Sequence, residues 1–204
     1  NLPYFTLRVT ASRRKLNLLK EPQVIYVLAE LFPDPRIEEN AVRRETHLNL
    51  VLVLDHSNSM NGVRLEKVKV AAHQIIESLT EKDIISVIGF NDRASVIIPA
   101  TYVRDKPALK ARISMMTASG GTEIYRGLSA GLDQVKQYLG PNLVNHILLL
   151  TDGRTYGDQP QSLELATKAA AEGISISAMG LGHDWNDEFL DQLASKTGGS
   201  SEYI

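Results

Sequence analysis

The sequence predicts an α/β fold with a doubly wound, mostly parallel sheet, one antiparallel edge strand and helices on both faces. Three observations lead to this fold class. From residue 48 onward, short apolar runs alternate with amphipathic stretches, which is typical of a parallel sheet covered by helices. Two of the apolar runs are joined by only three residues, so they must pair in antiparallel fashion. The chain of 204 residues, 43% of them apolar, is long enough for one well-packed domain and a smaller appendage.

The predicted elements follow one another from this point. Leu48–Leu54 is a buried central strand, and Val63–Leu79 carries apolar residues at helical spacing, which predicts the first covering helix. The strands Asp83–Phe90 and Ala94–Val103 flank the short connection Asn91–Arg93, so the second of them is an edge strand. The remaining elements are the helices Pro107–Met116 and Thr122–Leu139, the strand His146–Leu150, the helix Ser162–Glu172, the strand Ile174–Gly180, the helix Asp187–Ser195 and the short strand Ser201–Ile204.

The order of these elements predicts where a ligand binds. With right-handed crossovers, the chain winds outward from Leu48–Leu54 in one direction and returns on the other side of that strand at His146–Leu150. Open α/β sheets bind ligands beyond the carboxyl ends of their strands at such a reversal. Three loops therefore border the expected site: Asp55–Gly62, Thr117–Thr122 and Thr151–Pro160.

Residues 1–46 differ in kind from residues 47–204. Phe5, Leu7 and Val9 alternate with polar residues, and Val24–Phe32 is apolar on both parities except for one glutamate, which predicts two strands in a hairpin. The charged stretch Arg36–Glu45 is interpreted as a linker. Because an isolated two-stranded hairpin is marginal in water, we expect these strands to need a partner surface, on residues 47–204 or on a sister chain, and their exposed edge to promote self-association.

Composition excludes several classes of function. The formal charge of −2 leaves no excess of basic side chains for a nucleic-acid backbone. The absence of cysteine excludes disulfides, cysteine-ligated metals and thiol catalysis. Because no apolar run reaches the length of a membrane helix and no leader opens the sequence, we expect a soluble chain without membrane insertion. The compartment stays open, with the cytoplasm favoured.

Oxygen-bearing side chains gather on the three loops. The first loop places a carboxylate and two hydroxyls at alternate positions, Asp55, Ser57 and Ser59, from which they can converge on one point. The second loop contributes Thr122 after two glycines, and the third contributes Asp152. Hard oxygen ligands around one crevice are what Mg²⁺ requires. We interpret these five residues as ligands of a divalent metal.

Each residue also has a plainer interpretation. The two serines can cap the following helix, Thr122 can be a helix N-cap, and Asp152 can belong to a simple turn. The coincidence of all three loops at the switch point favours the metal site. Nucleotide binding is disfavoured, because the first strand is followed by neither G-x-x-x-x-G-K-[ST] nor G-x-G-x-x-G.

Three segments resemble the von Willebrand factor A (VWA) domain and its metal-ion-dependent adhesion site, as found in bacterial VWA proteins: Val51–Met60, Ser119–Thr122 and Leu148–Gly153. The resemblance covers about residues 47–204 and implies a truncation before the family's last helix. Residues 1–46 are similar to the flanking strands of bacterial VWA proteins whose β-sandwich is split around the VWA domain, which implies that these residues are half of a β-sandwich. It also implies that Ser57, Ser59 and Thr122 are direct ligands. Asp55 and Asp152 would bind directly or through water, and a partner's carboxylate would complete the coordination shell.

These features favour a protein-binding module over an enzyme. The expected ion is Mg²⁺, with Mn²⁺ or Ca²⁺ as alternatives, and the expected partner is a protein that offers Asp or Glu to it. Two alternatives stay open: a subunit of a chelatase-like or AAA+ assembly, and a metal-dependent hydrolase, for which we recognise no positioned base or nucleophile. Five residues are expected to form a rim that selects the partner, although the tryptophan can also pack on its own helix: His56, Tyr156, Asp158, Asp184 and Trp185.

Overall fold

A computed structural model describes residues 5–13, 15, 23–33, 45–152, 155, 157–181 and 187–203. The chain divides into two compact units, Asn1–Glu45 (unit 1) and Thr46–Ile204 (unit 2). Within the described ranges, no helix is both long enough and apolar enough to cross a membrane.

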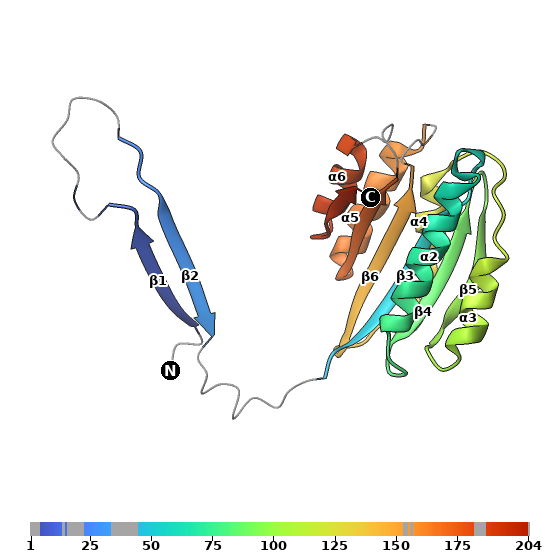
Figure 1. Ribbon diagram of the computed structural model, residues 1–204, viewed down its shortest axis with the longest axis horizontal. Coiled ribbons are helices and arrows are strands. Elements are labelled where there is room, and N and C mark those ends of the chain that lie inside the picture. The colour runs from blue at the N-terminus through green and yellow to red at the C-terminus, as the bar shows by residue number, and fades with distance from the viewer. Residues whose placement is uncertain are drawn as a thin grey trace. The chain divides into compact units, whose positions relative to one another are not determined.

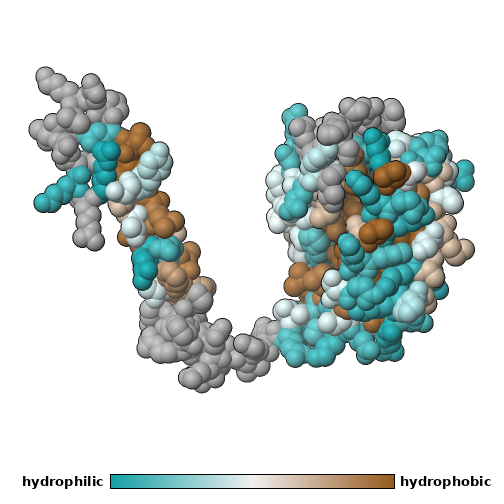
Figure 2. Space-filling view, in the orientation of Figure 1, coloured by the Kyte–Doolittle hydropathy of each residue, from teal (hydrophilic) through white to brown (hydrophobic). Residues whose placement is uncertain are grey.

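Unit 1 contains a two-stranded antiparallel sheet (Figure 1). Strand β1 (Phe5–Ala11) pairs with β2 (Val27–Pro33), which begins three residues later than the sequence predicts. Phe5, Leu7 and Val9 are all more than half exposed, and Figure 2 shows apolar residues along this sheet. The predicted hairpin is therefore confirmed, with apolar side chains that nothing in the described part of unit 1 covers.

Unit 2 is built on a six-stranded sheet in the order β5-β4-β3-β6-β7-β8 (Figure 1). Strand β5 runs antiparallel to β4, and the other neighbouring pairs are parallel. The chain leaves the central strand β3 toward β4 and later returns to the other side of β3 with β6. The predicted fold class and its switch point are thus confirmed. The strands are β3 (His47–Asp55), β4 (Ile84–Phe90), β5 (Ala94–Tyr102), β6 (Leu143–Thr151), β7 (Ile174–Gly180) and β8 (Ser201–Tyr203).

Helices cover both faces of this sheet (Figure 1). On one face, α2 (Val63–Ser78) and α3 (Lys106–Ser114) pack against the even-numbered apolar residues of β3. The odd-numbered residues of β3 face α4, α5 and α6. Covering on both faces explains why Leu50–Leu54 of β3 is an unbroken apolar run. The helices of the second face are α4 (Ile124–Val135), α5 (Gln159–Ala171) and α6 (Asp187–Ser195), and two short 3₁₀ helices are η1 (Asn58–Met60) and η2 (Lys136–Tyr138).

In unit 2, three elements differ from their predicted bounds by three residues or more. Helix α5 begins at Gln159 rather than Ser162, because Pro160 lies in its first turn, where proline needs no backbone N–H. The helix expected over Thr122–Leu139 begins at Ile124 and ends in the tighter turn of η2. Strand β6 extends three residues further toward the N-terminus than its apolar run indicates.

Strand β5 forms one edge of the sheet, as predicted. Pro99 lies within it and has no N–H to donate. The N–H of Ala100 donates to Oε1 of Gln134 on α4 at 2.9 Å. The register between β4 and β5 also shifts on both sides of Val87. The edge is therefore interrupted near the middle of the strand.

Candidate metal centre

Asp55, the last residue of β3, is fully buried at the switch point. One carboxylate oxygen accepts the backbone N–H of Ser57 at 2.8 Å, and the other accepts the hydroxyl of Thr151 at 2.6 Å. These bonds link the end of β3 to the end of β6. Burial raises the pKa of Asp55 above its usual range, the nearby charge of Asp152 adds to the shift, and the hydrogen bonds oppose it. A cation at this position would relieve the buried negative charge.

The two serines of the first loop face each other. The hydroxyl oxygens of Ser57 and Ser59 lie 3.0 Å apart. Ser57 precedes η1, but its side chain makes no capping hydrogen bond, and α2 starts after Gly62 without a side-chain cap. The interpretation of the serines as helix caps is therefore wrong.

The second loop is held against the first by backbone hydrogen bonds. The N–H of Asn58 donates to the carbonyl of Gly120 at 3.0 Å, and the N–H of Ser119 donates to the carbonyl of His56 at 2.8 Å. Gly120 has φ of +76°, and a Cβ there would lie 2.5 Å from a carboxylate oxygen of Asp92. Only glycine fits both this backbone conformation and this close approach.

This arrangement leaves Thr122 buried on the second loop, with 5% of its surface exposed. Helix α4 has Glu123 as its N-cap residue, so the interpretation of Thr122 as the N-cap is wrong. Asn91, which the sequence analysis did not single out, supports the loop. The side-chain amide of Asn91 donates to the backbone carbonyl of Ser119 at 2.8 Å, and the backbone carbonyl of Asn91 accepts the N–H of Glu123 at 2.8 Å.

The third loop contributes Asp152, which is 5% exposed. Its Oδ2 lies 3.4 Å from Nη1 of Arg64 on α2, and the same Nη1 donates to the carbonyl of Ser59 at 3.2 Å. Its Oδ1 is buried and has no hydrogen-bond partner among the described residues. The other buried side-chain oxygen without a hydrogen-bond partner among the described residues is Oδ1 of Asn49. It belongs to a neutral amide, and the nitrogen of that amide lies within hydrogen-bond distance of three acceptor oxygens. Of these two oxygens, that of Asp152 belongs to an acidic side chain, so its lack of a hydrogen-bond partner is the more costly and would be relieved by a bound cation.

Two of the predicted rim residues can be placed. His56 is half-buried, and its Nδ1 lies 3.0 Å from the carbonyl oxygen of Thr117. Asp158 is not exposed as a residue of the rim would be. It is buried, and its carboxylate accepts the N–H of Tyr125 at 2.7 Å and the hydroxyl of Thr155. Its carboxylate thereby holds the start of α4. The other three rim residues lie outside the described part of the chain: Tyr156, Asp184 and Trp185.

The oxygen groups at the switch point fit a hard divalent cation. Among the described residues, no group of three or more His, Asp or Glu could hold a metal, so an ion at this position would need further oxygen ligands such as hydroxyls, backbone carbonyls or water. Two buried carboxylates and the facing serine hydroxyls lie on the connected loops. The unpartnered Oδ1 of Asp152 supplies a free acceptor at this position.

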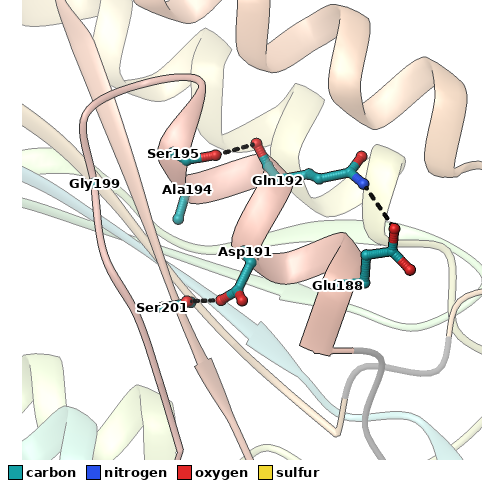
Figure 3. A pocket seen from close by; sticks show the side chains of 7 residues that line it. All are labelled: Glu188, Asp191, Gln192, Ala194, Ser195, Gly199 and Ser201. Atoms are coloured by element: carbon teal, nitrogen blue, oxygen red, sulfur yellow. Dashed lines mark hydrogen bonds between the residues drawn. The ribbon is translucent and has the colours of Figure 1, made fainter. Parts of the chain in front are cut away.

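The hollows on the described surface of unit 2 include two with different linings. One of about 690 Å³ lies between α6 and the segment that leads into β8, and most of its lining residues are polar (Figure 3). Its side chains bond to one another, since Asp191 accepts the hydroxyl of Ser201 and Gln192 donates to Glu188 at 3.3 Å. The second hollow, of about 380 Å³, is lined in part by His56 of the first loop.

Sequence comparison identifies relatives over most of the chain. The profile of the von Willebrand factor type A domain matches residues 49–204. The "Uncharacterized protein sll0103" of Synechocystis sp. is 41% identical over 162 residues, which is 79% of this chain and 38% of that protein. The chain thus spans less than two fifths of that relative.

Solved structures show the same fold. The von Willebrand factor type A protein from Catenulispora acidiphila aligns with a TM-score of 0.71 at 19% identity, covering 99% of this chain and 46% of that one. Proximal thread matrix protein 1 from the mussel byssus, with a zinc-occupied MIDAS motif, aligns with a TM-score of 0.68 at 23% identity, covering 80% and 43%. Because the family profile matches well over half of its residues, this chain belongs to the von Willebrand factor type A domain family.

Proposed function

We propose that unit 2 is a metal-dependent protein-binding module and not an enzyme. Its metal-ion-dependent adhesion site would consist of Asp55, Ser57, Ser59, Thr122 and Asp152. The observation that carries this proposal is the buried, unpartnered Oδ1 of Asp152 on a loop next to the buried Asp55. The absence of capping roles for the serines and Thr122 supports it, because helix capping then does not account for hydroxyls at these positions.

The donor set determines what such a site does. Three of the five proposed ligands are neutral hydroxyls, so they leave a bound divalent ion electron-poor and ready to accept a carboxylate from a partner protein. Arg64 adds a second positive group beside Asp152. Both favour an acidic partner residue in a partly buried crevice. Mg²⁺ is the proposed ion, with Mn²⁺ and Ca²⁺ as alternatives.

The local chemistry supports binding rather than catalysis. Both oxygens of Asp55 accept hydrogen bonds, so this carboxylate does not stand ready as a nucleophile. The Nδ1 of His56 lies against the carbonyl of Thr117. A phosphatase assay with Mg²⁺ tests this part of the proposal, and turnover that Asp55→Asn abolishes would contradict it.

Calorimetry tests the metal site directly. We expect one Mg²⁺ or Mn²⁺ to bind, and Asp55→Ala and Ser57→Ala to abolish or sharply weaken the binding. Ca²⁺ and Zn²⁺ are titrated in parallel, because zinc occupies the motif of the mussel protein. Ser78→Ala is the matched control, since this serine is exposed at the end of α2 and bonds within its own helix. Unchanged affinity in both site variants would overturn the assignment.

Capture of partners tests the adhesion role. Immobilised chain should retain proteins in Mg²⁺ and release them in EDTA, and Ser57→Ala should retain none of them. The rim proposal adds that Trp185→Ala weakens capture and leaves metal affinity unchanged. Loss of metal binding in Trp185→Ala would instead assign this residue a structural role.

A further inference from the structure

A groove of about 380 Å³ opens beside the first and second loops of unit 2. We name it the Met115 groove. Met115 and Met116 follow α3 on one side, and Ile97 of β5 lies on the other. Arg112 of α3 also lines it, and its remaining walls include His56 and Ser119.

The groove is continuous with the candidate metal centre. His56 stands in the sequence between Asp55 and Ser57, which are both proposed ligands. Its carbonyl accepts the N–H of Ser119, and its ring lies 3.0 Å from the carbonyl oxygen of Thr117, which also lines the groove. A partner segment that reaches the metal therefore meets the groove on the same surface.

The groove has an apolar interior with one exposed apolar wall. Met116 is 7% exposed and Ile97 is partly buried, whereas Met115 is 81% exposed. A methionine side chain is flexible and polarisable, so it can close over apolar groups of different shapes. Single exposed apolar residues are common on protein surfaces, but this one stands at the edge of a hollow.

The charge of the groove indicates the kind of partner. Arg112 is an exposed cation, and none of the residues that line the groove is acidic. This charge complements a segment that carries Asp or Glu. We propose that one partner segment binds unit 2 at two points: its carboxylate on the metal and a neighbouring apolar side chain in the Met115 groove. This inference rests on the proposed metal-dependent function and names the partner chemistry that the function would select.

Peptide titrations test the second point of contact. The probes are glycine–serine peptides with a single Asp, either without Leu or with Leu placed one to four residues after the Asp. With Mg²⁺ present, we expect at least one spacing to bind about fivefold more tightly than the Leu-free peptide. Without Mg²⁺, every peptide should lose most of its affinity.

Methionine methyl signals locate the bound peptide, because the chain has only four methionines. Met60 lies within the first loop, next to Ser59, and should respond to Mg²⁺, whereas Met115 and Met116 should respond to the Leu-containing peptide. Met179 of β7 serves as the internal reference. A Met115 signal that shifts with protein concentration alone would assign the groove to a second copy of the chain and overturn the proposal.

Two variants separate the groove from the metal. Met115→Ala should remove the gain from Leu and leave the affinity of the Leu-free peptide unchanged. Val70→Ala is the control, since Val70 is exposed on α2 and does not line the groove. If the Asp peptide binds with Mg²⁺ but Leu at no spacing improves it, or if Met115→Ala keeps the gain, the groove proposal is wrong alone. If no peptide shows Mg²⁺ dependence, the metal-dependent function fails and the groove proposal fails with it.

Discussion

Two buried carboxylates lie at opposite ends of the parallel strands of unit 2. At the amino end, Oδ1 of Asp83 accepts the N–H of Leu48 at 2.8 Å, and Oδ2 accepts the N–H and the hydroxyl of Thr80 at 2.7 and 2.8 Å. At the carboxyl end, Asp152 has one oxygen near Arg64 and one without a partner among the described residues. The first carboxylate is fully used by the fold, whereas the second keeps one oxygen without a hydrogen-bond partner among the described residues.

This difference indicates that the carboxylate at the amino end of the sheet stabilises the fold, whereas the carboxylate at the carboxyl end contributes little to stability and is available to a ligand. Burial would raise the pKa of Asp83, but the hydrogen bonds from Leu48 and Thr80 and the charge of His47 outweigh it and lower this pKa. The ionised form of Asp83 is therefore preferred by the folded state. A carboxylate with an unpartnered buried oxygen, as in Asp152, costs stability unless a ligand satisfies it.

The same substitution at both ends gives the sharpest test of this contrast, and we expect its largest effect at Asp83. Asp83→Asn places an amide NH2 among backbone and hydroxyl donors. In EDTA, the free energy of unfolding of this variant should therefore be about 1–3 kcal/mol lower than that of the native sequence. Chemical denaturation followed by circular dichroism measures this. An equal loss in Asp152→Asn would break the comparison.

The pH dependence provides the control for Asp83. Because its pKa is lowered in the folded state, its contribution to stability is present above the ordinary aspartate pKa and is lost as the pH falls through the folded-state pKa. The native protein should thus lose extra stability below about pH 4. Asp83→Asn should lack that part of the acid-induced loss, and an unchanged pH profile would contradict the assigned cause.

Asp152→Asn should show the opposite behaviour. It removes a charged oxygen from the candidate metal centre, so we expect Mg²⁺ affinity to fall by about 10- to 100-fold. In EDTA its stability should match or exceed that of the native chain, because the substitution removes the charge from a buried side chain whose Oδ1 has no hydrogen-bond partner among the described residues, at the cost only of a contact with the part-exposed Arg64. Calorimetry and denaturation on the same sample measure both quantities.

Arg64→Gln should have a smaller effect of mixed sign. Removing a cation beside the site reduces repulsion of the metal ion, so Mg²⁺ affinity should rise by about two- to fivefold at low salt. Capture of an acidic partner should weaken at the same time, because one positive group is lost. Lys69→Gln removes the same charge from α2 away from the site and serves as the control. If both variants behave alike, Arg64 acts only through net charge.

The smallest effect on the site should come from unit 1. Deleting residues 1–45 should leave Mg²⁺ affinity unchanged and abolish self-association, as measured by titration and light scattering. The reason is the exposed apolar face of β1 and β2. A full chain that stays monomeric at high concentration, with its hairpin amides protected from hydrogen exchange, would show that the hairpin needs no partner.

Most of the fold could be predicted because it depends on local patterns. The apolar run Leu50–Leu54 of β3 and the short connection before β5 determine the sheet type without knowledge of distant contacts. The roles of Arg64, Asn91 and Asp158 could not be predicted, because each of these side chains contacts a residue that is 28 or more positions away in the sequence. Spacing alone placed the oxygen groups of the first loop, but it did not reveal which of them the fold already uses.

The interrupted edge at β5 has a consequence for crowded solutions. A strand from another molecule that aligned with β5 would find no donor at Pro99 and an occupied N–H at Ala100. The shifted register around Val87 would also bend any added ladder out of line. Fibrillar growth by strand addition is therefore disfavoured along this part of the edge, which lowers the tendency of closely spaced copies of unit 2 to polymerise through it.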